Sequence, residues 1–296
     1  MLSFILIILA CAIVYYLYIT LQEYFKNPLS APVPPSPQYP TYAPQESSPY
    51  ALDPLDRLKN SYVGSSIGML GRVLEAGIGK NEQDRSTMSL LQQGIIEDFI
   101  KALCADMPKQ EADVRSLFAS YVPSKVLQHT ILYEENTNPL ATETLDSSTS
   151  DSIAKLARVF LDNTYGEYKK RLGFVGFLLL LAWSDRELND REQDVILDIA
   201  AFLEIDNQDF NTLYENFESL KDYTLNPESI ATYTKALQTE SAQFMQATED
   251  NPKAYQECYL AQIQKICAQA RKKDQAPDLT LKKLWECESA YEALIA

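Results

Sequence analysis

The sequence is poor in histidine, and its cysteines are few and scattered. Any mechanism that needs an imidazole has one candidate, His129, so a Ser-His-Asp triad or a histidine-rich metal site is not expected. None of the five cysteines belongs to a C-x-x-C pair; they stand at positions 11, 104, 258, 267 and 287. This odd set fits neither a disulfide framework nor a thiolate metal site, and it indicates a reducing compartment.

Basic residues are outnumbered by acidic ones, 26 Lys and Arg against 41 Asp and Glu, which gives a net charge of −15. A surface that neutralises phosphates needs clustered Lys and Arg, so nucleic acid is not an expected partner. The chain of 296 residues is 46% hydrophobic and 23% charged. That balance excludes global disorder and supports one large or two ordinary domains with a buried core.

Charged side chains are missing from the first 22 residues, which are apolar apart from a few small polar groups. The run is long enough to cross a hydrocarbon core of about 30 Å as a helix, so we predict a transmembrane anchor over residues 1–25. A cleaved signal peptide is the alternative, but it would carry basic residues ahead of the apolar stretch. Lys26, Arg57 and Lys59 all follow the span, so the positive-inside rule places the N-terminus outside and the bulk of the chain in the cytoplasm.

Aliphatic residues become scarce in residues 26–54, where nine of the fifteen prolines are found. This composition predicts an extended, polyproline-like linker. A ligand for a proline-binding module is the functional alternative.

Beyond residue 55 no stretch alternates with a period of two for long enough to demand a strand, and apolar residues recur at helical spacing. The clearest stripe is Val63, Ile67, Leu70 and Leu74. We therefore predict an all-α fold with one helical region over residues 55–222 and a second over residues 223–296.

An uncharged run of twelve, residues 172–183, is too short to span a bilayer and predicts a helix buried on nearly every side. Acidic sequence follows at once, with eleven acids and two arginines between positions 185 and 218. Asn189 and Glu192 form the pattern of a capping box, which starts an amphipathic helix. Its expected inward residues are Val195, Ile196, Ile199, Phe202 and Leu203.

Residues 184–192, S-D-R-E-L-N-D-R-E, follow the pattern A-D-G-x-[ILV]-x-x-x-E of the TerB-like helical domain, which this part of the chain resembles. Arg186 stands in place of the glycine. An N-terminal span followed by this domain is similar to the DjlA branch of membrane-anchored DnaJ-like proteins. An earlier copy of the motif would lie in residues 71–103, where Ala76 replaces the acid. The resemblance implies a bacterial inner-membrane protein associated with chaperones or the stress response.

The same resemblance implies a divalent-cation or partner site in this acidic turn, at Asp185, Glu187, Asp190 and Glu192. Oxygen ligands of this kind would suit calcium or magnesium, and no other cofactor is expected. A structural role competes, because carboxylates in the first turn of a helix are stabilised by its dipole and Glu192 also caps it.

The C-terminal region resembles a J-domain, in which two antiparallel helices flank a His-Pro-Asp loop. Residues 252–273 predict an amphipathic helix, Ala276-Pro277-Asp278 breaks it, and a final helix contains S-A-Y-E-A-L at residues 289–294. Ala276 stands where the histidine belongs, so the ATPase of a DnaK-type chaperone is not expected to be stimulated. The expected partner-binding residues are Lys265, Arg271, Lys272, Ala276, Pro277 and Asp278. An ordinary helical hairpin is the alternative.

No enzyme activity is expected. The stretch E-A-G-I-G-K-N ends in Asn81, where a phosphate loop would need Ser or Thr. The expected function is protein interaction at the membrane, with a DnaK-type chaperone or a J-protein as partner. A cation-binding stress module that acts through the acidic turn is the alternative.

Overall fold

The computed structural model describes residues 54–77, 88–122, 152–245 and 251–296, and all regular structure in these ranges is helical. The predicted all-α class is thus confirmed for them. The α-helices are α2 (Pro54–Lys59), α3 (Tyr62–Gly77), α4 (Leu90–Leu103), α5 (Glu111–Tyr121), α7 (Ile153–Asn163), α8 (Tyr168–Ala182), α9 (Asp190–Phe202), α10 (Asn207–Glu218), α11 (Pro227–Met245), α12 (Asn251–Lys272) and α13 (Pro277–Ile295), with short 3₁₀ turns η1 (Pro108–Gln110) and η3 (Trp183–Asp185).

The predicted anchor over residues 1–25 and His129 lie outside the described residues, as does all but the last residue of the predicted linker. Among the helices that are described, none combines the length and apolarity needed to cross a bilayer.

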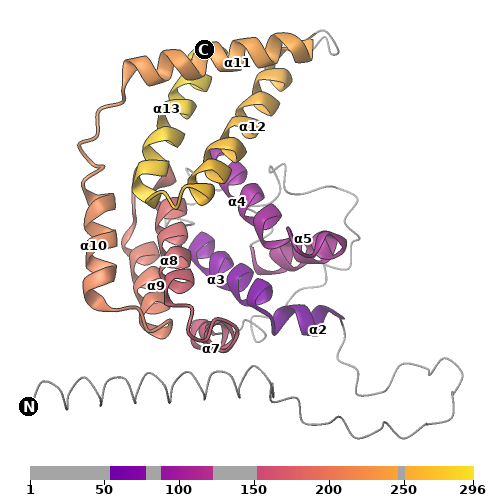
Figure 1. The fold of residues 1–296 in the computed structure, drawn as a ribbon, viewed down its shortest axis with the longest axis vertical. Coiled ribbons are helices and arrows are strands. Elements are labelled where there is room, and N and C mark those ends of the chain that lie inside the picture. The colour runs from indigo at the N-terminus through magenta and orange to yellow at the C-terminus, as the bar shows by residue number, and fades with distance from the viewer. Residues whose placement is uncertain (1–53, 78–87, 123–151, 246–250) are drawn as a thin grey trace, which may run out of the picture. The chain divides into compact units, whose positions relative to one another are not determined.

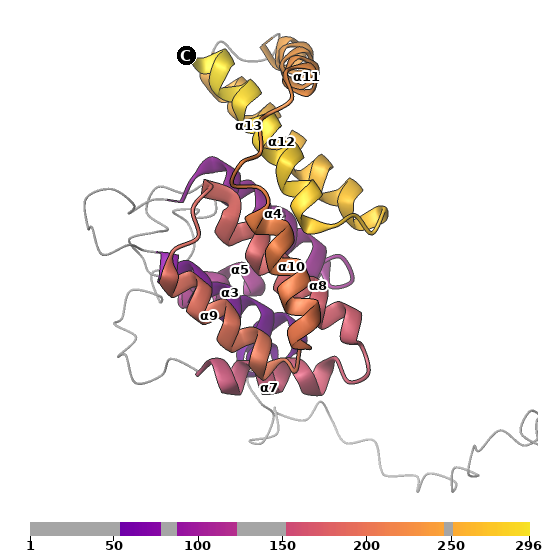
Figure 2. The same ribbon diagram turned by 90° about the vertical axis from the view of Figure 1, so that its left-hand side faces the viewer.

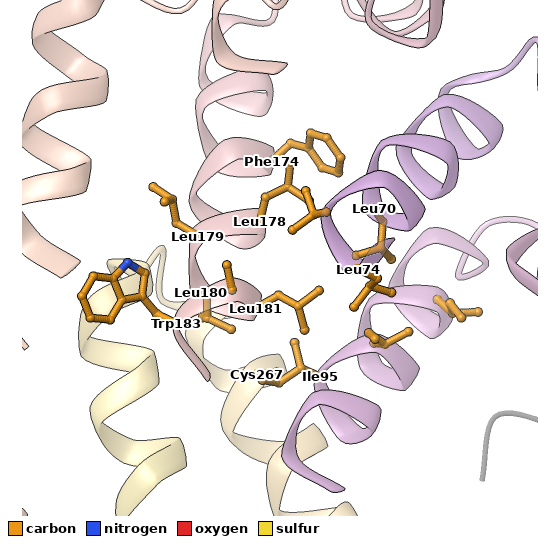
Figure 3. Packing of buried hydrophobic residues seen from close by; sticks show 14 of the residues in the cluster. Leu70, Leu74, Ile95, Phe174, Leu178, Leu179, Leu180, Leu181, Trp183 and Cys267 are labelled. Carbon is orange, nitrogen blue, oxygen red and sulfur yellow. The ribbon is translucent and has the colours of Figure 1, made fainter. Parts of the chain in front are cut away.

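The uncharged run that forms most of α8 lies in the core, as its composition predicts. Leu178 and Leu179 are fully buried, and Trp183 just beyond the helix is 1% exposed. In Figure 3, Leu178 and Leu181 lie between α8 and the side chains of Leu70 and Leu74 on α3. The stripe that predicted α3 is likewise buried. Burial of large aliphatic side chains in this layer contributes roughly 1.5–3 kcal/mol each to folding.

Helix α9 begins at the predicted capping box. The amide of Glu192 donates to Asn189 Oδ1 at 2.9 Å, and the amide of Asn189 donates to Glu192 Oε2 at 3.1 Å. Ile196, Ile199 and Leu203 face the core. The predicted inward position of Phe202 is wrong, because its side chain is 46% exposed. One residue rotates an α-helix by about 100°, so burying Leu203 turns Phe202 away.

Helices α12 and α13 form an antiparallel hairpin, and α11 crosses both of them at the end away from the turn (Figure 1). Figure 2, turned by 90°, again shows α12 and α13 side by side. Tyr259 of α12 stacks on Tyr291 of α13 with ring centroids 4.4 Å apart. The predicted inward residues Ile263, Ile266 and Ala270 are buried.

Residues 52–296 make one compact unit, and one hydrophobic cluster runs through the described helices from α3 to α13. The predicted boundary at residues 222 and 223 falls between α10 and α11. Helix α12 packs on α4 across that boundary, so the hairpin shares its core with the helices that precede it.

Candidate functional site: a groove at the hairpin turn

A groove of about 1030 Å³ lies between α4, α8, the first turn of α3 and the turn that joins α12 to α13. Its apolar walls come mainly from α4 and α8 and include Phe99, Leu103, Met107, Phe174 and Phe177. Ligand-binding clefts in proteins typically occupy about 300–1,000 Å³ and are lined in this way. The groove is therefore the best candidate for a binding site in the described part of the chain.

Aromatic contacts hold the groove walls in place. The Phe99 ring of α4 stacks on Phe177 of α8 at a centroid distance of 4.1 Å and lies 6.2 Å from Phe174. Phe174 in turn lies 4.9 Å from Phe160 of α7. Such pairs contribute about 0.5–1.5 kcal/mol each beyond the burial of their area, so the two walls are fixed relative to each other.

An ion pair forms part of the groove lining. Both terminal nitrogens of Arg271 on α12 bond the carboxylate of Asp98 on α4, Nη2 with Oδ1 at 2.9 Å and Nη1 with Oδ2. The Asp98 side chain is 8% exposed and that of Arg271 is 49% exposed. Bidentate pairs are among the stronger charged hydrogen bonds, so this contact ties α12 to α4.

Cys267 also borders the groove, next to the ion pair. Burial, with a smaller contribution from the nearby Asp98 carboxylate, raises the pKa of its thiol to about 12. A thiol that stays protonated at neutral pH is a poor nucleophile and a poor metal ligand. The four cysteines in the described residues are buried free thiols.

Two lysines from the first turn of α8, Lys169 and Lys170, also line the groove. Lys170 pairs with Glu167 at 3.0 Å, and its ammonium lies 4.4 Å from the centroid of the Tyr62 ring. Lys169 makes no ion pair with any residue that the structure describes, so its charge faces solvent beside the apolar walls.

Three of the six predicted partner-binding residues, Arg271, Ala276 and Pro277, line this groove together. The other three are placed differently. Asp278 is 8% exposed in the first turn of α13, so it offers little surface to a partner. Lys265 lies 3.9 Å from Glu240 of α11. Lys272 is exposed and follows the lining residue Arg271 in the sequence, but it does not itself line the groove.

The four carboxylates of the predicted cation site are not brought together. Glu192 is 5% exposed and directs Oε2 to the cap of α9, while a Cβ at Gly77 would lie 2.5 Å from its Oε1. Asp185 accepts a hydrogen bond from the amide of Glu187 at 3.2 Å. In the described part of the chain no three His, Cys, Asp or Glu side chains are grouped so that they could hold a metal ion.

The acidic turn instead contacts the C-terminal helix. Trp285 of α13 donates from Nε1 to the carbonyl of Ser184 at 2.9 Å, and the Arg186 guanidinium lies 5.2 Å from the Trp285 ring centroid. The backbone of Arg186 has a φ of 69°, in the left-handed region that favours glycine. A side chain makes this backbone conformation less favourable than it would be for glycine, and the side chain of Arg186 packs against α13.

Sequence reasoning missed Asp98, the residue that anchors the hairpin to α4. A signal for it existed, because Asp98 follows Leu91 by seven residues and Ile95 by three, which puts it on the apolar face of α4. A buried carboxylate requires a partner. The identity of that partner, 173 residues further along the chain, has no local signal.

Comparison with known proteins found no relative of this chain. No family model matches the chain, and neither a curated protein nor a solved structure matches it.

Proposed function

We propose that this chain is a protein-interaction module, tethered to the bacterial inner membrane with its bulk in the cytoplasm and resembling DjlA-type co-chaperones. The observation that carries the proposal is the α12–α13 hairpin, whose turn places Arg271, Ala276 and Pro277 at an open apolar groove. A surface of this kind, with apolar walls and charges at its edge, is typical of a binding site for another protein.

We further propose that binding leaves the ATPase of a DnaK-type chaperone unstimulated. In the resembled family, stimulation depends on the histidine of the His-Pro-Asp loop. Ala276 occupies that position in the turn, and a methyl group can neither donate nor accept a hydrogen bond.

The test uses the full-length chain with a purified DnaK-type chaperone. We expect binding that weakens as salt rises from about 50 to 500 mM, because exposed charges are screened. Lys272→Glu should weaken binding, whereas Lys235→Glu on the exposed face of α11 should not. The chaperone should hydrolyse ATP at its basal rate in the presence of the natural chain. Ala276→His, which restores the His-Pro-Asp tripeptide, should raise that rate.

Two outcomes would overturn the proposal. One is ATPase stimulation by the natural chain. The other is absence of chaperone binding together with a rise in melting temperature on adding millimolar calcium or magnesium, since a ligand that binds only the native state stabilises it. Loss of that rise in Asp185→Asn with Glu192→Gln would assign the function to the acidic turn.

A further inference from the structure

We propose that Arg186, Trp285 and Glu288 form a pH-sensitive switch between the acidic turn and α13. The Arg186 guanidinium lies on the Trp285 ring while Glu288 is neutral, and it moves to the Glu288 carboxylate when that group loses its proton to solvent. The three residues lie outside the groove, and the inference does not depend on the proposed function.

Trp285 is the fixed member of the switch. Its side chain is 3% exposed, and its Nε1 donates to the carbonyl of Ser184 at 2.9 Å, which holds the indole against the turn. The Arg186 guanidinium lies 5.2 Å from the ring centroid, within the range of a cation–π interaction. Arg186 itself is exposed, and an exposed side chain changes rotamer rapidly. It can therefore leave the ring without disturbing the core.

Glu288 offers the same guanidinium a second place to bind. It follows Trp285 by three residues, and side chains with this spacing are neighbours on one face of a helix. The Glu288 carboxyl is half-buried, yet it makes no ion pair or hydrogen bond with any residue that the structure describes. A half-buried carboxylate without a partner is unfavourable. Arg186 is close enough for its charge to act on Glu288, so it can supply that partner by a short movement.

The surroundings of Glu288 place its ionisation near neutral pH. Burial is the main reason why the pKa of its carboxyl rises to about 7. The Glu292 carboxylate on α13 and the Asp185 carboxylate on the turn also raise this pKa, whereas the Arg186 guanidinium lowers it. Below this pH the cation–π contact with Trp285 is unopposed. Above it, a charge-assisted hydrogen bond to the carboxylate competes for the guanidinium and is the stronger contact.

Other titratable groups near Glu288 keep their charge state around neutral pH. Tyr259 of α12 and Cys287 of α13 both feel the charge of Glu288, but burial raises the pKa of each, that of Cys287 to about 12. From α11, the carboxylate of Glu240 acts on Cys287. The part of α8 that leads into the turn, residues 172–182, holds no charged side chain. A change near pH 7 at this contact therefore points to Glu288.

The backbone of Arg186 allows its side chain to be removed without disturbing the turn. Its φ of 69° lies in the left-handed region, which glycine adopts more readily than arginine. Arg186→Gly should thus keep the hydrogen bond between Trp285 and Ser184 while it removes the guanidinium. Arg186→Asn is the second variant if the first does not fold, because asparagine also tolerates this region.

Fluorine NMR of the full-length chain labelled with 5-fluorotryptophan tests the switch. The sequence contains two tryptophans, Trp183 and Trp285, and Trp285→Phe assigns their resonances. As pH rises, the Trp285 resonance should shift with a midpoint at about pH 7, because the guanidinium leaves the ring. Trp183 is the internal control. Its side chain is 1% exposed, and its resonance should stay nearly constant.

Four variants identify the groups responsible. Glu288→Gln should abolish the shift and leave Trp285 at its low-pH position, and Arg186→Gly should also abolish it. Glu292→Gln should keep the shift but lower its midpoint, because the Glu292 carboxylate raises the pKa of Glu288. Glu228→Gln, on the exposed first turn of α11, should change neither the shift nor its midpoint. Circular dichroism checks that each variant is folded.

Three results would overturn the inference. One is a Trp285 resonance in the natural chain that does not change with pH. Another is a shift that Glu288→Gln leaves in place, since the titrating group would then be a different one. The third is a shift that persists in a folded Arg186→Gly or Arg186→Asn chain. The indole would then sense the Glu288 carboxylate directly, with no movement of Arg186.

Discussion

At the scale of single residues, the core of the fold depends on side chains such as Leu179, which is fully buried in the middle of α8. Leu179→Asp would place a carboxylate without a partner in an apolar interior. We expect the free energy of unfolding to fall by more than about 3 kcal/mol, enough to unfold a domain of ordinary stability. Thermal melting followed by circular dichroism measures this.

Asp185→Asn is the matched control, because Asp185 is exposed and an asparagine oxygen can still accept the hydrogen bond from the Glu187 amide. Its melting temperature should stay close to that of the natural chain. If Leu179→Asp also melted at the natural temperature, α8 would not lie in the core of the protein in solution.

A second residue-scale effect concerns Glu288, a partly buried residue on α13 near the acidic turn. Burial is the main reason why the pKa of its carboxyl rises from 4.5 to about 7. The nearby carboxylates of Glu292 and Asp185 also raise this pKa, whereas the Arg186 guanidinium lowers it. Between pH 4.5 and about pH 7, the Glu288 carboxyl therefore keeps its proton in the folded chain but has lost it in the unfolded chain. Stability from this group is therefore present below about pH 4.5 and is lost as pH rises through 7.

Glu288→Gln should remove this pH dependence, because glutamine is neutral throughout. We expect the variant to melt a few degrees above the natural chain at pH 8 and at nearly the same temperature at pH 4.5. Glu228→Gln on the exposed first turn of α11 is the control. An equal gain from Glu288→Gln at both pH values would show that its charge is not the cause.

At the scale of elements, the docking of α12 on α4 depends on the Asp98–Arg271 pair. Arg271→Ala leaves a buried carboxylate without its partner, and we expect a loss of about 1–3 kcal/mol in the free energy of unfolding. Asp98→Ala with Arg271→Ala removes both charges and should cost less than the sum of the two single changes. Urea unfolding of the natural chain, of Asp98→Ala, of Arg271→Ala and of the double variant gives the coupling energy.

The exposed pair Lys265–Glu240 is the comparison, since its side chains are 59% and 39% exposed and 3.9 Å apart. Its coupling energy should be close to zero. A coupling of Asp98 with Arg271 that is equally small would mean that apolar packing alone holds the hairpin on α4.

Elements with strong local signals could be predicted from the sequence. The stripe of α3, the uncharged run of α8 and the capping box of α9 each arise from residues within a few turns of one another. Phe202 was wrongly predicted to face inward. The neighbouring helices cover Leu203 and leave the adjacent Phe202 exposed. The position of Phe202 follows from tertiary packing, which spacing along one helix does not determine.

At the scale of the whole molecule, the candidate site could not be predicted in the same way. The groove brings Phe99, Phe177 and Pro277 together from segments about 80 to 100 residues apart, and its walls exist only after the helices pack. The residues of the hairpin turn were found because they resemble a family loop. Lys169 and Phe177 had no such signal, since a lysine in a first turn and a phenylalanine in an apolar run are typical of ordinary helices.

The whole chain also makes a topological prediction. The first 22 residues carry no charge, and Lys26, Arg57 and Lys59 all follow them, so the positive-inside rule places the C-terminus in the cytoplasm. A C-terminal reporter that functions only in the cytoplasm should be active, and one that functions only outside it should be silent. Periplasmic protease should leave residues 55–296 intact. Cleavage of these residues with protection of the N-terminus would reverse the orientation, and it would place the groove in a compartment where a cytoplasmic chaperone could not reach it.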